Sequence, residues 1–303
     1  MSVLGAGLIT KVTRIAGHGA IRVRGTVIRI KKNKTQRNLF KHQRDLFVKN
    51  FVRQRMNPFS VLDPTLSCQA RRGLCALTVM TKAPQAGQVK TRLVPPLTPD
   101  EAAELNKCFL RDTAAAISSV LANNEACGIA AYTPLGVEAA YADILPADFN
   151  LLPQRGVSFG ERLYFAAEDL LRCGFDSVCL IDSDSPTLPA SNFSEAIRIL
   201  KMHGERIVIG PCDDGGYYLI GLKKPHRELF EQIDWSTERV FAQTRARARE
   251  IGLEVELLAH GYDVDDAASL RRLCKELLSQ STSDSIAPST RKFLAAIVAQ
   301  KKL

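Results

Sequence analysis

The sequence lacks the patterns that mark several common protein classes. No apolar run approaches the roughly 18 residues that a membrane-spanning helix requires. The eight cysteines include no C-x-x-C pair and the five histidines form no pair at metal-ligand spacing, so neither a zinc site nor a disulfide framework is expected. Neither G-x-x-x-x-G-K-[ST] nor G-x-G-x-x-G is present. We therefore expect a cytoplasmic protein with reduced thiols, whose functional site depends on other motifs.

Acidic residues are scarce at the N-terminus. Residues 1–72 hold 16 Lys+Arg and two acidic residues, whereas residues 73–303 hold 25 and 30, so the net charge of +9 belongs to a basic N-terminal extension. Residues 20–30 alternate apolar and basic side chains around Gly25, which predicts a hairpin. Three interpretations remain open: an organelle or membrane-surface leader, a nucleic-acid arm, and a loosely structured extension upstream of a start at Met56. The third is favoured because runs of like charge usually stay solvated.

Short apolar runs alternate with amphipathic segments along residues 73–280. Continuous apolar runs are typical of strands buried on both faces, and S/T-x-x-E capping boxes predict helix starts. The expected strands are 74–80, 126–132, 177–181, 206–210 and 253–258, and the expected helices are 99–122, 137–144, 158–173, one from Asn192, 236–251, 261–280 and 291–303. This order predicts an α/β fold, a doubly wound, mostly parallel sheet over 73–280, followed by a linker and a C-terminal helix in 281–303.

Two aspartates follow the strand expected at 177–181. Asp182 and Asp184 stand one residue apart at its C-terminal end, the edge where open α/β sheets bind ligands. On an extended segment both carboxylates point the same way and are suited to one hard divalent cation, Mg²⁺ or Mn²⁺. The alternative is an ordinary Asp-Ser-Pro turn.

A basic loop follows the first expected strand. Lys82, Gly87, Lys90 and Arg92 combine a glycine that allows close backbone approach with three cations, which is the chemistry that a nucleotide phosphate requires. A solvated basic loop is the alternative, since the segment matches no established phosphate-loop motif.

An Asp-Asp-Gly-Gly string after the strand at 206–210 predicts a tight turn. Gly215 and Gly216 would let a substrate lie against the backbone, and Asp214 could hydrogen-bond sugar hydroxyls or act as a catalytic base. A plain hairpin turn is the alternative. Farther along, Asp265 could be only the N-cap of the helix expected over 261–280.

Five motifs together resemble the radical-SAM/selenodomain-associated transferases, a branch of the glycosyltransferase A-type, or nucleotide-diphospho-sugar transferase, fold. They are Lys-Ala-Pro-x-x-Gly-x-Val-Lys-Thr-Arg-Leu at 82–93, Ser-Asp-Ser-Pro at 183–186, Asp-Gly-Gly-Tyr-Tyr-Leu-Ile-Gly-Leu at 214–222, Trp-Ser-Thr at 235–237 and Tyr-Asp-Val-Asp at 262–265. The superfamily includes the 2-phospho-lactate and molybdenum-cofactor guanylyltransferases. The resemblance implies nucleotide binding by the first loop, metal binding by Asp184 and a second metal-side carboxylate at Asp265. It also marks Trp235 as a substrate-binding candidate. Asp182 departs from the glycine usual in the family, so it is either an added ligand or a bystander.

The leading hypothesis is a metal-dependent glycosyltransferase that uses a nucleotide-diphosphate sugar and an unknown small-molecule or lipid acceptor. The metal would lie at Asp184, with the loop cations on the phosphates. One alternative is a nucleotidyltransferase acting on a phosphorylated small molecule. Another is an inactive nucleotide-binding protein tethered by its basic leader; for the body itself no nucleic-acid partner is expected.

Overall fold

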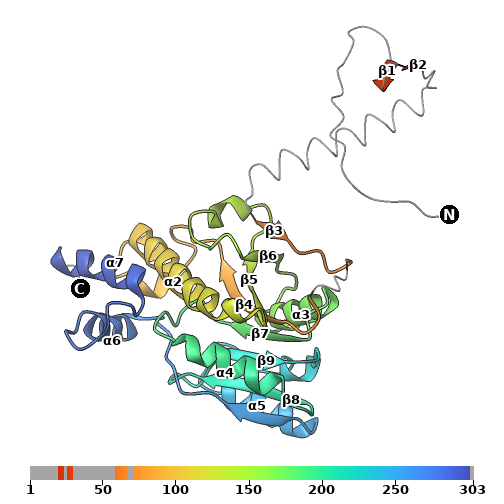
Figure 1. Ribbon diagram of the computed structural model, residues 1–303. Helices are drawn as coiled ribbons and strands as arrows, with labels where there is room; N and C mark the ends of the chain where they lie inside the picture. Colours follow the sequence, from red (N-terminus) through yellow and green to blue (C-terminus); the bar gives the residue numbers. More distant parts are fainter. Residues whose placement is uncertain (1–19, 24–25, 30–58, 67–70, 301–303) are drawn as a thin grey trace. The chain divides into compact units, whose positions relative to one another are not determined.

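The computed structural model describes residues 20–23, 26–29, 59–66 and 71–300. The chain divides into two units, residues 1–56 and 57–303. In the first unit, β1 (Ala20–Val23) and β2 (Thr26–Arg29) pair antiparallel, which confirms the hairpin predicted over 20–30 (Figure 1). Most of the remaining basic extension lies outside the described residues.

An eight-stranded sheet forms the second unit, with strand order β10-β8-β9-β7-β4-β5-β6-β3 (Figure 1). The strands are β3 (Ser60–Val61), β4 (Cys75–Lys82), β5 (Ala126–Thr133), β6 (Asn150–Pro153), β7 (Ser177–Ile181), β8 (Arg206–Pro211), β9 (Tyr217–Leu222) and β10 (Glu254–Leu257). Only β9 runs antiparallel to its neighbours β7 and β8, and the other pairs are parallel. The predicted mostly parallel α/β sheet is therefore confirmed.

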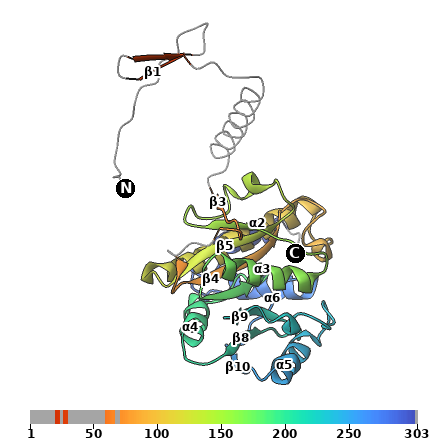
Figure 2. The ribbon, with the colours of Figure 1, turned by 90° about the vertical axis from the view of Figure 1, so that its right-hand side faces the viewer.

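Helices cover both faces of this sheet (Figure 2). The described α-helices of this unit are α2 (Pro99–Val120), α3 (Phe159–Arg172), α4 (Ala190–Leu200), α5 (Val240–Glu250), α6 (Ala267–Leu277) and α7 (Pro288–Ala299). Residues of α2 and α4 share one buried cluster with the sheet, and residues of α3 and α5 share another. Successive residues of β4 alternate between the two clusters, as expected of a strand buried on both sides.

A third buried cluster joins α6 and α7 to the start of α2. Leu105 and Phe109 of α2 pack there with Leu273 of α6 and Leu294 of α7. The predicted C-terminal helix is thus part of the folded body. Among the described helices, none is long and apolar enough to cross a membrane.

Several helices begin or end at other residues than the sequence predicts, each for a local reason. The capping boxes at Thr98 and Ser158 are present, but α4 begins before Asn192, whose amide instead donates to the Tyr218 hydroxyl at 2.8 Å. Ser236 does not cap α5, which starts at Val240. The helix expected over 137–144 is a short 3-10 turn, Glu138–Tyr141, and β6 was not predicted because its apolar run is too short to stand out.

The sheet also includes residues that the sequence analysis assigned to the extension. Strand β3 pairs in parallel with β6, and the neighbouring Phe59 and Leu62 are buried in the core. This edge strand lies well before residue 73, so the folded body begins earlier than the charge boundary.

Candidate active site

The candidate site is assembled at the C-terminal edge of the sheet. The parallel strands β4, β7 and β10 all end there, so the loop with Lys90, the turn with Asp184 and the segment with Asp265 meet. A backbone hydrogen bond of 3.0 Å from the Val264 N–H to the Asp184 carbonyl oxygen joins two of these segments. Backbone contacts alone therefore hold these segments, which are far apart in sequence, next to one another.

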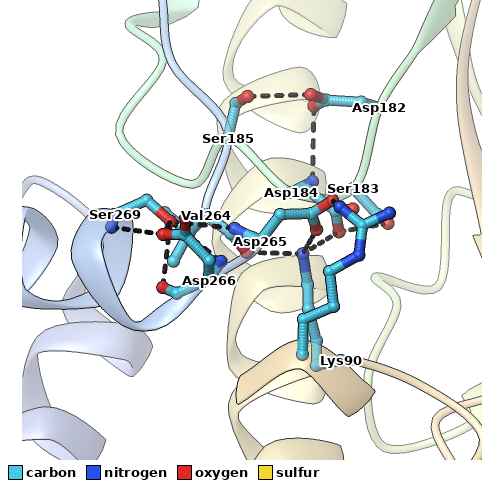
Figure 3. Close-up of polar contacts among 10 residues, drawn as sticks. Lys90, Asp182, Ser183, Asp184, Ser185, Val264, Asp265, Asp266 and Ser269 are labelled. Atoms are coloured by element: carbon cyan, nitrogen blue, oxygen red, sulfur yellow. Dashed lines mark hydrogen bonds and ion pairs between the residues drawn. The ribbon is translucent and has the colours of Figure 1, made fainter. Parts of the chain in front are cut away.

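Lys90 lies between two of the predicted carboxylates (Figure 3). Its Nζ is 2.9 Å from Asp184 Oδ1 and 2.9 Å from Asp265 Oδ1, and it donates to the Val264 carbonyl oxygen at 2.7 Å. The Lys90 side chain is only 3% exposed, whereas Asp184 is 31% and Asp265 41% exposed. The cation is thus on the buried side of the pair.

The surroundings of Lys90 keep it charged. Burial opposes the charge, but Asp184 and Asp265 outweigh burial and raise the pKa of the Lys90 ammonium. The Phe109 ring, with its centroid 5.5 Å from Nζ, adds a cation–π contact. The backbone of Lys90 is left-handed, with φ of 49°, a conformation that costs energy in a residue other than glycine.

Asp182 makes its contacts within its own turn. One carboxylate oxygen accepts the Ser185 hydroxyl at 2.8 Å, and the other accepts the Asp184 N–H at 3.3 Å (Figure 3). Burial, followed by the charge of Asp184, raises the pKa of the Asp182 carboxyl well above its usual range. These contacts make Asp182 an organiser of the turn that presents Asp184. Its role as an added metal ligand stays a prediction.

The N-cap alternative for Asp265 is wrong, because the neighbouring Asp266 caps α6. The Ser269 N–H donates to the Asp266 carboxylate at 2.8 Å, and the hydroxyl of Ser269 bonds back in a reciprocal cap (Figure 3). Asp265 is consequently available to Lys90 and, at 3.5 Å, to Arg92.

A pocket of about 220 Å³ opens beside these carboxylates. Five aspartates contribute to its lining: Asp182, Asp184, Asp214, Asp263 and Asp265. Aromatic rings also line it, with the Trp235 ring edge-to-face on Phe159 at 5.1 Å and on Tyr217 at 6.4 Å between centroids. One pocket therefore offers both a charged surface and apolar ring faces.

The Asp-Asp-Gly-Gly turn reaches the pocket because β9 is antiparallel. Strand β9 begins at the edge where β8 ends, so the connecting turn lies beside Asp184. Asp214 accepts the Gly216 N–H at 2.8 Å, and both residues line the pocket. The interpretation of Gly215 needs correction: a Cβ there would lie 2.2 Å from the Glu238 carbonyl oxygen, so its space is taken by the protein backbone.

The basic loop is only partly gathered at the carboxylates. Lys90 is buried beside them, and Arg92 lies next to Asp265 with its side chain 68% exposed. Lys82 instead donates to Gln88 at 3.2 Å, and Gly87 adopts a φ of 72° in open space. Gly87 therefore permits the turn, and close approach of a phosphate to this loop stays a prediction.

Several pocket residues were not named as candidates from the sequence, among them Asp263, Phe159 and Tyr217. Asp263 was part of a recognised motif, and its spacing of two from Asp265 was the available signal. Burial, with Asp214 and Asp265, raises the pKa of the Asp263 carboxyl to about 6. Tyr217 was likewise part of a recognised motif, at 214–222. Phe159 carried no signal for the site, because only the fold brings the start of α3 beside the start of β9.

The donor set suits a divalent ion that the substrate helps to bind. Among the described residues, no group of three or more His, Cys, Asp or Glu side chains is arranged to hold a metal. Asp184 and Asp265 nevertheless direct one oxygen each to a common cation, the Lys90 ammonium. Mg²⁺ is commonly held by one or two carboxylates, with substrate phosphates and water completing its shell. This pair fits that pattern.

Comparisons with known proteins agree with the fold. The profile of the DUF2064 family, described as an uncharacterized protein conserved in bacteria, matches residues 116–237. A solved structure from Desulfovibrio desulfuricans G20, provisionally named a nucleotide-diphospho-sugar transferase, has a TM-score of 0.66 at 30% identity, covering 74% of this chain and 95% of its own. No protein with a curated description matches significantly. The Desulfovibrio structure confirms the predicted fold; the radical-SAM/selenodomain association stays a resemblance of motifs.

Two more distant structures have bound or named substrates. Glucosyl-3-phosphoglycerate synthase from Mycobacterium tuberculosis, solved with Mn²⁺, UDP and phosphoglyceric acid, has a TM-score of 0.40 at 12% identity over 75% of this chain and 78% of its own. The 4-diphosphocytidyl-2C-methyl-D-erythritol synthase from Anaerococcus prevotii has a TM-score of 0.42 at 10% identity over 68% and 97%.

Proposed function

Since the chain belongs to the DUF2064 family and shares its fold with a protein provisionally named a nucleotide-diphospho-sugar transferase, we propose that it is a metal-dependent glycosyltransferase. It would bind a nucleotide-diphosphate sugar and transfer the glycosyl group to a small-molecule or lipid acceptor. The observation that carries this proposal is the pocket itself, which is lined by both a cation-binding carboxylate pair and a group of aromatic rings.

The two sides of the pocket suit the two parts of such a donor. A bound Mg²⁺ or Mn²⁺ would neutralise the diphosphate and stabilise the charge that develops on it as the leaving group. Asp184 and Asp265 would hold the metal, and Arg92 at the rim would add positive charge. The rings of Trp235 and Phe159 offer apolar surface to the sugar, and Asp214 lies where it can accept a hydrogen bond from a sugar or acceptor hydroxyl.

A ligand-stabilisation panel tests this function. Nucleotide-diphosphate sugars and nucleoside triphosphates are added to the full chain, each with and without Mn²⁺, and thermal unfolding is followed. A ligand at about 100 times its Kd raises the free energy of unfolding by roughly 2.7 kcal/mol. Mn²⁺-dependent stabilisation by at least one nucleotide sugar, followed by glycosyl transfer or slow donor hydrolysis, is expected. Stabilisation by triphosphates alone would replace the proposal with nucleotidyl transfer, and no response to either class would refute both.

A further inference from the structure

Lys90 has no ammonium hydrogen left for a substrate. An ammonium group carries three donors, and three protein oxygens lie within hydrogen-bonding distance of the Lys90 Nζ, from Asp184, Asp265 and the Val264 carbonyl (Figure 3). In this arrangement protein oxygens use all three ammonium hydrogens of Lys90, so a phosphate could bind Lys90 only by displacing one of these oxygens.

The Lys90 ammonium also occupies the position between the two carboxylates where a bound metal would lie. Asp184 Oδ1 and Asp265 Oδ1 converge on it from 2.9 Å each, so a divalent ion that used the same two oxygens would come close to a buried positive charge. A divalent ion and an ammonium a few ångströms apart repel each other strongly at the effective dielectric constants found in proteins. The carboxylate pair can therefore satisfy the ammonium or the metal, but both together only at a large cost.

The local structure shows that Lys90 is held in place firmly. Its side chain is buried against Phe109, and its backbone is left-handed, a conformation that persists only where the surroundings impose it. Arg92, the other cation near Asp265, is exposed and 3.5 Å away, so its contact with the pair is weaker.

We propose that Lys90 is an internal cation that competes with the divalent metal for the Asp184–Asp265 pair. In the free protein it holds the two carboxylates together, and metal binding displaces it. The displaced ammonium is then available to the phosphates of the donor. This inference deepens the proposed function and rests on it only for the last step. A metal that displaces Lys90 frees the ammonium for the phosphates, and a nucleotide that binds the ammonium frees the carboxylates for the metal. Metal and nucleotide therefore bind cooperatively.

The decisive experiment is a calorimetric Mn²⁺ titration without nucleotide. The full-length parent is compared with Lys90→Met, with Lys90→Gln, which keeps a neutral donor, and with Lys107→Met. The last is a matched control, because Lys107 pairs with Glu104 at 2.8 Å on α2, outside the pocket. Removing the competing ammonium should lower the Mn²⁺ Kd roughly tenfold or more in both Lys90 variants. The control should bind Mn²⁺ like the parent. Unchanged or weaker Mn²⁺ binding by the Lys90 variants would overturn the inference.

A second measurement needs no variant. NMR of the side-chain ammonium groups in the parent should show a protected Lys90 signal, which shifts or is lost when Mg²⁺ saturates the protein. Mg²⁺ binding that leaves this signal unchanged would overturn the inference even if the Lys90 variants fail to fold.

The outcomes separate this inference from the proposed function. Tighter Mn²⁺ binding by Lys90→Met in a protein that binds no nucleotide sugar would support the internal cation and refute the transferase. Mn²⁺-dependent binding of a nucleotide sugar by the parent, with no gain in Mn²⁺ affinity in either Lys90 variant, would support the transferase and refute the internal cation. Absence of Mn²⁺ binding by the parent and all variants would refute both.

Discussion

The two sides of the pocket are built in different ways. The charged side, Lys90 with Asp184 and Asp265, is fixed by the ends of three parallel strands, by a backbone bond and by a buried ammonium. The aromatic side, Phe159 with Tyr217 and Trp235, depends on ring contacts, and Phe159 is 52% exposed. The backbone positions of the two carboxylates are therefore set by the fold, and Lys90 is the part of the charged side that we propose to move. The aromatic side depends on ring contacts of an exposed residue, so it can adjust to its ligand. Four substitutions test this contrast, from the largest expected effect to the smallest.

Asp184→Asn should have the largest effect, confined to the charged side. The amide keeps the shape but removes the negative charge that faces the cation, so Mn²⁺-dependent nucleotide binding should weaken by about 100-fold or more. The variant should also unfold more easily, because buried Lys90 loses an ionic partner. Isothermal titration and urea unfolding measure the two effects. Asp284→Asn, at a 97% exposed carboxylate, is the control; parent-like titration of Asp184→Asn would show that the pair is not the metal site.

Gly215→Ala should disturb the turn that joins the two sides. Its φ is 86°, and the new Cβ would meet the Glu238 backbone at 2.2 Å, so we expect a loss of about 2–3 kcal/mol in the free energy of unfolding. Gly87→Ala is the matched control, since it has positive φ but open space around it, and should lose only about 1 kcal/mol. Equal losses in urea unfolding would mean that the contact with Glu238 carries no cost.

Trp235→Ala should affect the aromatic side alone. Loss of the ring should weaken binding of a nucleotide sugar roughly two- to tenfold, the range expected for one aromatic contact. Binding of the matching nucleoside diphosphate and of Mn²⁺ should stay as in the parent, because the ring packs on Phe159 and Tyr217 and supplies no metal ligand. The comparison of the two nucleotide Kd values is the measurement. An equal loss for sugar-bearing and sugar-free ligands would place the nucleotide, and not the sugar, on this wall.

Asp182→Gly should have the smallest effect on binding. The substitution removes the acceptor of the Ser185 hydroxyl and introduces a flexible residue, which should cost about 1 kcal/mol of unfolding free energy. Metal and nucleotide binding should persist, since the carboxylates of Asp184 and Asp265 are both retained. If Asp182→Gly abolished Mn²⁺ binding while Asp184→Asn preserved it, the metal would belong to Asp182.

The predicted aspartates show how far local reasoning reaches. Asp184 follows an apolar run that is buried as expected, so its place at the sheet edge could be read from the chain. Asp265 could not be separated from an N-cap, because Asp265 and Asp266 are equally plausible caps until the start of α6 is known. Lys90 was predicted to bind phosphate on the strength of its charge. Its actual partners lie far along the chain, and no local pattern identifies them.

The sequence by itself determined the alternation of strands and helices, the capping boxes at Thr98 and Ser158, and the edge of the sheet that bears the candidate site residues. These features depend on side-chain periodicity and on hydrogen bonds a few residues apart. Only the tertiary structure decided that β9 lies between β8 and β7, that the space beside Gly215 is filled by the Glu238 backbone and that Lys90 is shared by two carboxylates. Each of these depends on contacts between segments remote in sequence, whose free energy is gained only when the strands of the sheet have come together.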